Sequence, residues 1–125
     1  MTKKPAKSKA REDRLHFEII VDAHDVEEQV MGWHNYLEDK MSFPFTAKCI
    51  GEREISPLQK GDKAEVIGLA SEDECQREMF VEIQWERRGL AVPLSQIKPI
   101  AQTDAETKEA VDDWHYWVGQ GYEFG

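Results

Sequence analysis

Apolar residues recur every three or four positions along the first third of the chain, a spacing that is typical of one face of an α-helix. These positions are Leu15, Ile19, Ala23, Val26, Val30, Trp33, Leu37 and Met41. Asp25, with Glu28 three residues later, forms a capping box, so a helix is predicted over residues 26–40. Residues 12–22 are also predicted to be helical, with a strand as the alternative because Ile19–Val21 is β-branched.

Between Phe43 and Ile100 the pattern changes to short stretches rich in Val, Ile, Phe and Trp that alternate with glycine and polar turns. This pattern predicts β-strands. The expected strands cover residues 45–50, 63–69, 79–86, 89–93 and 97–100. A short turn over Leu94–Gln96 separates the last two strands. This order of strands and turn is typical of small SH3-like five-stranded barrels.

The end of the chain returns to a helical pattern. Its expected buried face consists of Thr107, Ala110, Val111, Trp114 and Val118. Thr103 is expected to cap this helix, with Glu106 three residues later, and Gly119 and Gly121 are expected to end it. The predicted fold class is therefore α+β, a small SH3-like five-stranded β-barrel flanked by N-terminal and C-terminal helices.

Length and composition are those of one domain. The chain has 125 residues, of which 40% are hydrophobic, enough to form a single core without disulfides. Residues 1–11 are polar and basic and are expected to be a disordered tail, which leaves residues 12–125 as the domain. No apolar run approaches the roughly 20 residues needed to cross a bilayer, and no secretory pattern is present. A cytoplasmic location without membrane contact is therefore expected, with Cys49 and Cys75 reduced.

The negative charge is concentrated in the predicted domain, because all 25 acidic residues lie beyond residue 11. Such a body repels the phosphate backbone of nucleic acids, so no nucleic-acid binding through it is expected. The same charge attracts cations, although many soluble proteins are acidic only to stay soluble.

Sequence motifs of common enzyme active sites are missing. The sequence contains no glycine-rich phosphate loop, no G-x-S-x-G elbow and no H-E-x-x-H pair. Cys75 lies in an acidic loop, which disfavours its thiolate and makes it a poor nucleophile. The chain is therefore predicted not to be an enzyme. A transition-metal site at His34 and Glu38, or at His24 and Glu28, is a less favoured alternative.

Carboxylate side chains remain as candidate functional groups. The densest cluster is Glu72-Asp73-Glu74, between two predicted strands; Glu38-Asp39 ends the long helix, and Asp113 lies on the last helix. Calcium takes six to eight oxygen ligands at roughly 2.3–2.6 Å, which carboxylates and backbone carbonyls supply. No EF-hand loop is present, so a calcium site has to be assembled from separate segments. The alternative for each cluster is a solvated loop or helix face.

A calcium site is predicted from these clusters. The predicted ligands are Glu38, Asp39, Glu72, Asp73, Glu74 and Asp113. The end of helix 26–40 is expected to pack beside the loop 71–78, so that one ion bridges the two clusters. A carboxylate at a helix C-terminus, as at Asp39, is disfavoured by about 0.3–1 kcal/mol, and a bound cation would offset that cost.

Five longer segments are unusual in composition and occur in a characteristic order. They are EIIVDA (18–23), W-x-x-YLEDKMSFPFTAKC (33–49), ASEDECQREMFVEIQWE (70–86), LAVPLSQIKPI (90–100) and VDDWHYWV (111–118). Together they resemble the cyanobacterial calcium-binding CcbP family and its bacterial relatives. The resemblance implies a small cytosolic calcium binder without EF-hands, with one stronger and one weaker site. It also implies acidic family positions at Glu38, Asp39 and the loop 72–74.

Three classes of function follow. The favoured one is a single calcium-binding domain that acts as an intracellular Ca²⁺ buffer or sensor. An unidentified protein partner is compatible with this class. The second is an SH3-like interaction module whose acidic surface binds a basic partner. In that case Trp33, Trp85 or Trp114 would form an exposed groove, whereas a core position is the expectation for each of them. The third is a metalloenzyme, for which no base or nucleophile is identified.

Overall fold

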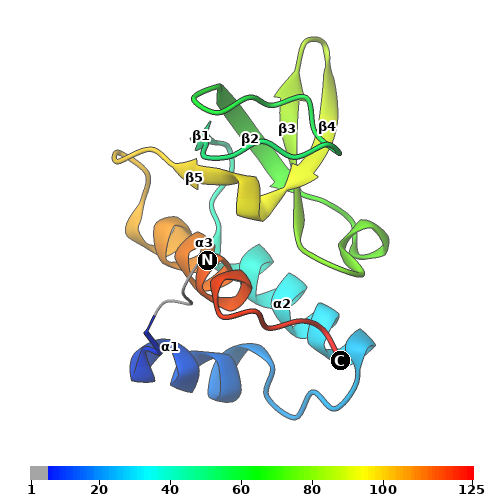
Figure 1. Ribbon diagram of the computed structural model, residues 1–125, viewed down its shortest axis with the longest axis vertical. Helices are drawn as coiled ribbons and strands as arrows, with labels where there is room; N and C mark the ends of the chain where they lie inside the picture. Colours follow the sequence, from blue (N-terminus) through cyan, green and yellow to red (C-terminus); the bar gives the residue numbers. More distant parts are fainter. Residues whose placement is uncertain (1–5) are drawn as a thin grey trace.

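The protein has an α+β fold in which helices lie on one side of an antiparallel sheet (Figure 1). The computed structural model describes residues 6–125. Its helices are α1 (Lys9–Arg14), the π-helical turn η1 (Leu15–Ile19), α2 (Val26–Lys40) and α3 (Ala105–Gly119). Its strands are β1 (Phe45–Cys49), β2 (Lys63–Leu69), β3 (Phe80–Trp85), β4 (Arg88–Pro93) and β5 (Ile97–Pro99). Two short 3₁₀ turns are η2 (Glu72–Cys75) and η3 (Leu94–Gln96).

The five strands form one sheet in the order β4-β3-β2-β1-β5, and every neighbouring pair is antiparallel. The predicted strands and the turn over Leu94–Gln96 are therefore confirmed, with their ends shifted by at most one residue. β4 and β5 are the edge strands and are not paired with each other, so the hydrogen-bonded sheet is open. The α+β class is confirmed, whereas closure into a barrel is not.

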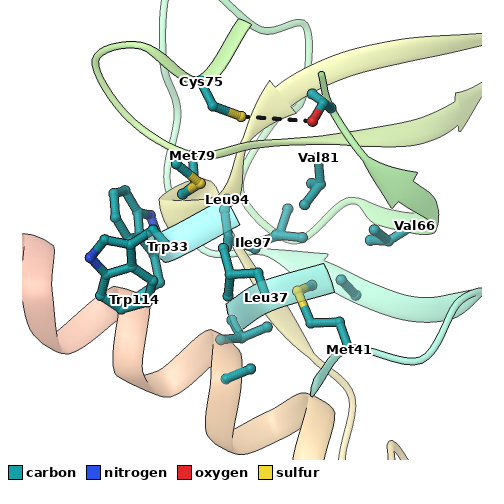
Figure 2. Close-up of a cluster of buried hydrophobic side chains, with 14 of the residues drawn as sticks. Trp33, Leu37, Met41, Val66, Cys75, Met79, Val81, Leu94, Ile97 and Trp114 are labelled. Atoms are coloured by element: carbon teal, nitrogen blue, oxygen red, sulfur yellow. Dashed lines mark hydrogen bonds between the residues drawn. The ribbon is translucent and has the colours of Figure 1, made fainter. Parts of the chain in front are cut away.

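The core lies between the sheet and the two long helices. Trp33 of α2 meets Trp114 of α3 edge to face, with ring centroids 4.9 Å apart, and both side chains are at most 1% exposed. Leu94 and Ile97 approach this pair from the sheet side (Figure 2). Trp85 is half-buried. The expected core position is therefore confirmed for Trp33 and Trp114.

Both long helices begin at a side-chain cap. The Asp25 carboxylate accepts a hydrogen bond from the backbone N–H of Glu28 at 2.8 Å, and α2 has the predicted bounds. For α3 the cap is Asp104, which accepts from the N–H of Thr107 at 3.0 Å, so the prediction of Thr103 is wrong by one residue. The physical reason is that Asp104 has the extended backbone of an N-cap and that its carboxylate also accepts a hydrogen bond from the hydroxyl of Thr107, at 2.8 Å.

Residues 9–23, here called the N-terminal arm, lie on the side of α2 and α3 that faces away from the sheet (Figure 1). The arm comprises α1, η1 and the turn that follows, in which Asp22 has a φ of 54°. The predicted helix over residues 12–22 is confirmed as far as Ile19. The predicted disordered tail over residues 1–11 is wrong for residues 9–11, which are helical, and its first five residues lie outside the described part of the chain.

Polar contacts hold the first half of the arm, and apolar contacts hold the second half. α1 has no buried residue, but its Glu12 accepts hydrogen bonds from the hydroxyls of Tyr116 at 2.5 Å and Tyr122 at 2.9 Å. Leu15 and Ile19 of η1 are buried in the core. A tyrosine hydroxyl bonded to a carboxylate forms a stronger contact than two neutral groups would, so α1 depends on charge for its position.

Gly32 lets the arm lie directly against α2. A Cβ atom added at this position would collide with the backbone carbonyl oxygen of Ile19. The residue occupies the middle of α2, where glycine costs about 1 kcal/mol relative to alanine. This glycine therefore allows the backbone of the arm to approach the backbone of α2 closely.

Gly32→Ala is expected to destabilise the metal-free protein, although alanine favours a helix. The clash with Ile19 should cost about 1–3 kcal/mol, more than the propensity gain. Urea unfolding followed by circular dichroism measures the change. Asn35→Ala is the control, because Asn35 is exposed on the same helix and the same gain in propensity comes without a clash. A Gly32→Ala variant as stable as the control would contradict the packing argument.

Glu12→Gln is expected to destabilise the protein only above about pH 4. Burial raises the pKa of Glu12, but the hydrogen bonds from Tyr116 and Tyr122 outweigh it and leave the pKa lowered. A carboxylate whose pKa is lower in the folded state stabilises the fold above its unfolded pKa, and that contribution is lost as pH falls through the folded value. Melting temperatures from pH 7 to pH 3 should therefore converge at the acid end. Asp13→Asn, in an exposed pair with Lys9, should show no such convergence.

Candidate metal centre

The six predicted ligands lie in three separate places. Glu38 and Asp39 are exposed in the last turn of α2, residues 72–74 are exposed in η2, and Asp113 is buried on α3. Within residues 6–125, no group of three or more histidine, cysteine, aspartate or glutamate side chains is close enough to hold a metal ion. A calcium ion therefore needs side chains to move toward it, or backbone and amide oxygens to complete its shell.

Asp39 lines a groove of about 780 Å³ between α2 and the N-terminal arm, here called the acidic groove. Its carboxylates are Glu18, Glu27, Glu28 and Asp39. Asn35 adds a side-chain amide oxygen. Lys40, the last residue of α2, places one positive charge at the end of the groove where that helix ends. In the described part of the chain none of these four carboxylates forms an ion pair. The groove thus gathers four carboxylates against one lysine, and it carries a net negative charge on hard oxygen ligands.

The helical repeat of α2 explains the shape of the acidic groove. Glu28, Gly32, Asn35 and Asp39 are spaced by four, three and four residues, so they form one stripe along the helix. Gly32 sits in the middle of that stripe and brings the arm backbone close. Glu28 and Asp39 are eleven residues apart, or about 16 Å along the axis, too far to share one ion directly. Any ion in the groove therefore binds toward one end.

Glu72 and Asp73 line a second hollow, of about 470 Å³, against the first half of α2. The α2 residues there are Val26, Glu27, Val30 and Met31, and Glu27 thus borders both the hollow and the acidic groove. The prediction that the 71–78 loop packs beside the end of α2 is therefore wrong.

Two contacts fix the position of this loop. His34 bonds the carbonyl oxygen of Ala70 through Nε2 at 2.8 Å, and the buried Cys75 Sγ accepts from the N–H of Phe80 at 3.3 Å. Burial raises the pKa of the Cys75 thiol, which agrees with its being a poor nucleophile (Figure 2).

Asp113 is surrounded by cationic and hydroxyl donors. Arg11 donates to it at 2.6 Å, Arg14 donates two bonds at 2.8 and 2.9 Å, and the hydroxyl of Tyr36 donates at 2.7 Å. Hydrogen bonding to Asp113 raises the pKa of Arg14, and burial together with the same carboxylate raises the pKa of Tyr36. A calcium ion at Asp113 would have to displace two guanidinium groups. These contacts do not support Asp113 as a ligand and give it a role in holding the arm.

The histidines offer no ready transition-metal site. Nε2 of His34 and Nε2 of His115 are each within hydrogen-bond distance of a backbone carbonyl oxygen, at 2.8 Å for Ala70 and 2.7 Å for Ile97. Each of these nitrogens therefore carries a proton and is not a metal ligand. Burial also lowers the pKa of His115, which keeps that ring neutral.

No helix of the described residues has the length and apolar character needed to span a membrane.

Sequence reasoning found Asp39 but missed its partners across the groove. Glu18 comes from the arm, and Glu27 and Glu28 come from the start of α2. In the sequence, Glu18 and Glu27 stand among other charged residues with no distinctive spacing, and Glu28 was considered only in the capping box and in a transition-metal pair with His24. The stripe from Glu28 to Asp39 is a usable signal, because a glycine and polar residues follow one another at helical spacing opposite the apolar face.

Comparisons with known proteins agree with a calcium-binding role. A model of the CcbP family, described as calcium binding, matches residues 13–118. The crystal structure of Anabaena CcbP is 39% identical, with a TM-score of 0.84, and the match covers 96% of this chain and 98% of that one. A second solved structure, a calcium binding protein in the calcium-binding form, is 38% identical, with a TM-score of 0.83 and coverage of 94% and 96%. None of the curated proteins compared with the chain matches it. The chain therefore belongs to the CcbP family and is a calcium-binding protein.

Proposed function

We propose that the protein is a cytoplasmic calcium buffer or sensor that binds its strongest ion in the acidic groove. The observation that carries the proposal is the unneutralised set of Glu18, Glu27, Glu28 and Asp39 between α2 and the arm. Carboxylate, amide and carbonyl oxygens are the ligands that calcium prefers. Side chains on two segments can move toward an ion and bring further oxygens with them.

The predicted ligands divide between two sites in this proposal. Asp39 belongs to the acidic groove, where Asn35 lies one helical turn away and Glu18 lies on the arm. Glu72 and Asp73 belong to the hollow beside Glu27, and a second, weaker ion binds there. Glu38 and Glu74 line neither space and remain weaker candidates for the outer part of either shell.

The arm supports a sensor as well as a buffer. A sensor changes shape on binding, whereas a buffer does not need to. α1 has no buried residue, and polar contacts hold it beside α3. An ion in the acidic groove would attract oxygens of the arm, and the arm could respond at a modest free-energy cost.

The proposal also covers the domain as a whole, beyond the acidic groove. The predicted domain of residues 12–125, extended at its start to Lys9, acts as one calcium-binding domain with an SH3-like arrangement of strands and no catalytic activity. An interaction module based on an exposed aromatic groove is not favoured, because Trp33 and Trp114 are buried in the core. A basic protein partner for the acidic surface is compatible with calcium binding.

Asp39→Asn is expected to weaken calcium binding at least about tenfold, because a ligating anion becomes a neutral amide. Titration calorimetry in 0.15 M KCl measures the affinity, since exposed counterion binding is screened over about 8 Å at that salt concentration. Glu54→Gln removes another exposed negative charge, which lies outside both spaces, and should change the affinity less than about twofold.

Two results would contradict the location of the site. One is an Asp39→Asn variant that binds calcium as tightly as the parent protein. The other is an equal loss in Glu54→Gln, which would mean that only the overall negative charge matters. The parent protein should also melt at a higher temperature with millimolar calcium than with chelator, and magnesium should raise the melting temperature less.

A further inference from the structure

The carboxylate of Asp113 lies where the arm, α2 and α3 meet. Asp113 belongs to α3, Arg11 and Arg14 belong to the arm, and Tyr36 belongs to α2. The side chain is 2% exposed, and its two oxygens together accept four hydrogen bonds. One carboxylate thus joins three helices, and the network uses up its capacity to accept hydrogen bonds.

This network is next to the acidic groove. Tyr36, which donates to Asp113 at 2.7 Å, also lines the groove. Arg14 is the last residue of α1, and the helix continues without a break into η1, whose Glu18 and Ile19 line the opposite wall. Arg14 is therefore separated from this wall by a single helical turn, closed by the hydrogen bond from the N–H of Ile20 to the carbonyl oxygen of Leu15.

We propose that Asp113 is a positioning residue for calcium: it holds the arm and Tyr36 at the spacing that the acidic groove needs, and it does not touch the ion. The inference rests on the proposed location of the ion in that groove. The buried contacts of α1 are few, so the two guanidinium groups on Asp113 and the hydroxyls on Glu12 set its distance from α2. Groups that orient the ligands of a metal commonly change its affinity by about 10–100-fold when they are replaced.

Arg14→Gln separates a positioning role from direct ligation by the sign of its effect. If Asp113 ligated calcium, removing a competing cation from it would strengthen binding. If Asp113 acts by holding the arm, the same change loosens the arm and weakens binding. The side chain of Arg14 is 20% exposed, so the variant is less disruptive than a change at the buried carboxylate.

The experiment compares Asp113→Asn, Arg14→Gln and the control Asp13→Asn by calcium calorimetry in 0.15 M KCl. Asp13 lies on the same helix in an exposed pair with Lys9, away from Asp113. Asp113→Asn and Arg14→Gln should each weaken calcium binding about tenfold. Asp13→Asn should leave it unchanged.

Hydrogen exchange of the metal-free proteins gives a second readout. Both weakening variants should exchange faster over residues 9–23, while amides of β2 and β3 stay protected as in the parent protein. Arg14→Gln decides the question alone if Asp113→Asn does not fold.

The outcomes separate this inference from the proposed site. Tighter calcium binding by Arg14→Gln would identify Asp113 as a ligand and overturn the inference. Unchanged affinity in both variants with faster exchange in the arm would also overturn it, because the arm would then not shape the groove. If Asp39→Asn still weakens binding in that case, the proposed site stands. If Asp39→Asn has no effect either, the site lies elsewhere and both proposals fail.

Discussion

The edge-to-face contact of Trp33 with Trp114 fixes how the two long helices lie against each other beneath the sheet. Each indole brings roughly 150–250 Å² of surface into the core, where only the indole of Trp117 is as large. Because this contact and the buried Leu37 turn one side of α2 inward, the opposite side of the helix faces the N-terminal arm. The acidic groove is a consequence of that constraint, since the carboxylates and the amide that α2 contributes lie on the side of the helix that the core does not use, opposite Glu18 of the arm.

The carboxylates on the two sides of the arm differ in burial and in their ion-pair partners. Toward α3, Asp113 is buried and balanced by Arg11 and Arg14. Toward α2, Glu18 and Asp39 are exposed and, within residues 6–125, have no ion-pair partner. A buried carboxylate without a partner would be costly, whereas exposed carboxylates keep their hydration and remain available to a cation. The same residue type therefore stabilises the fold at one place and is left exposed to cations at the other.

Elements set by local spacing could be predicted from the sequence, and those set by distant contacts could not. The bounds of α2 follow from its capping residue and apolar repeat, and the strands follow from their turns. The start of α1 was missed because Arg11 pairs with a carboxylate 102 positions away. Of the residues that line the acidic groove, only Asp39 was predicted as a calcium ligand. A groove formed between two segments leaves no spacing pattern in the sequence of either segment. Asp113 was predicted as a ligand, but its hydrogen bonds to Arg11, Arg14 and Tyr36 indicate a structural role, and contacts this distant leave no pattern in the sequence.

The central claim is that calcium binds between α2 and the arm. Nuclear magnetic resonance of the ¹⁵N-labelled protein, with a paramagnetic lanthanide added in place of calcium at a small fraction of one equivalent, tests it directly. The account predicts that amide signals of residues 18–23 and 32–39 broaden first, with those of residues 72–76 following as more ion is added. Broadening that begins at the turn between β3 and β4, and leaves the groove unaffected, would contradict the account.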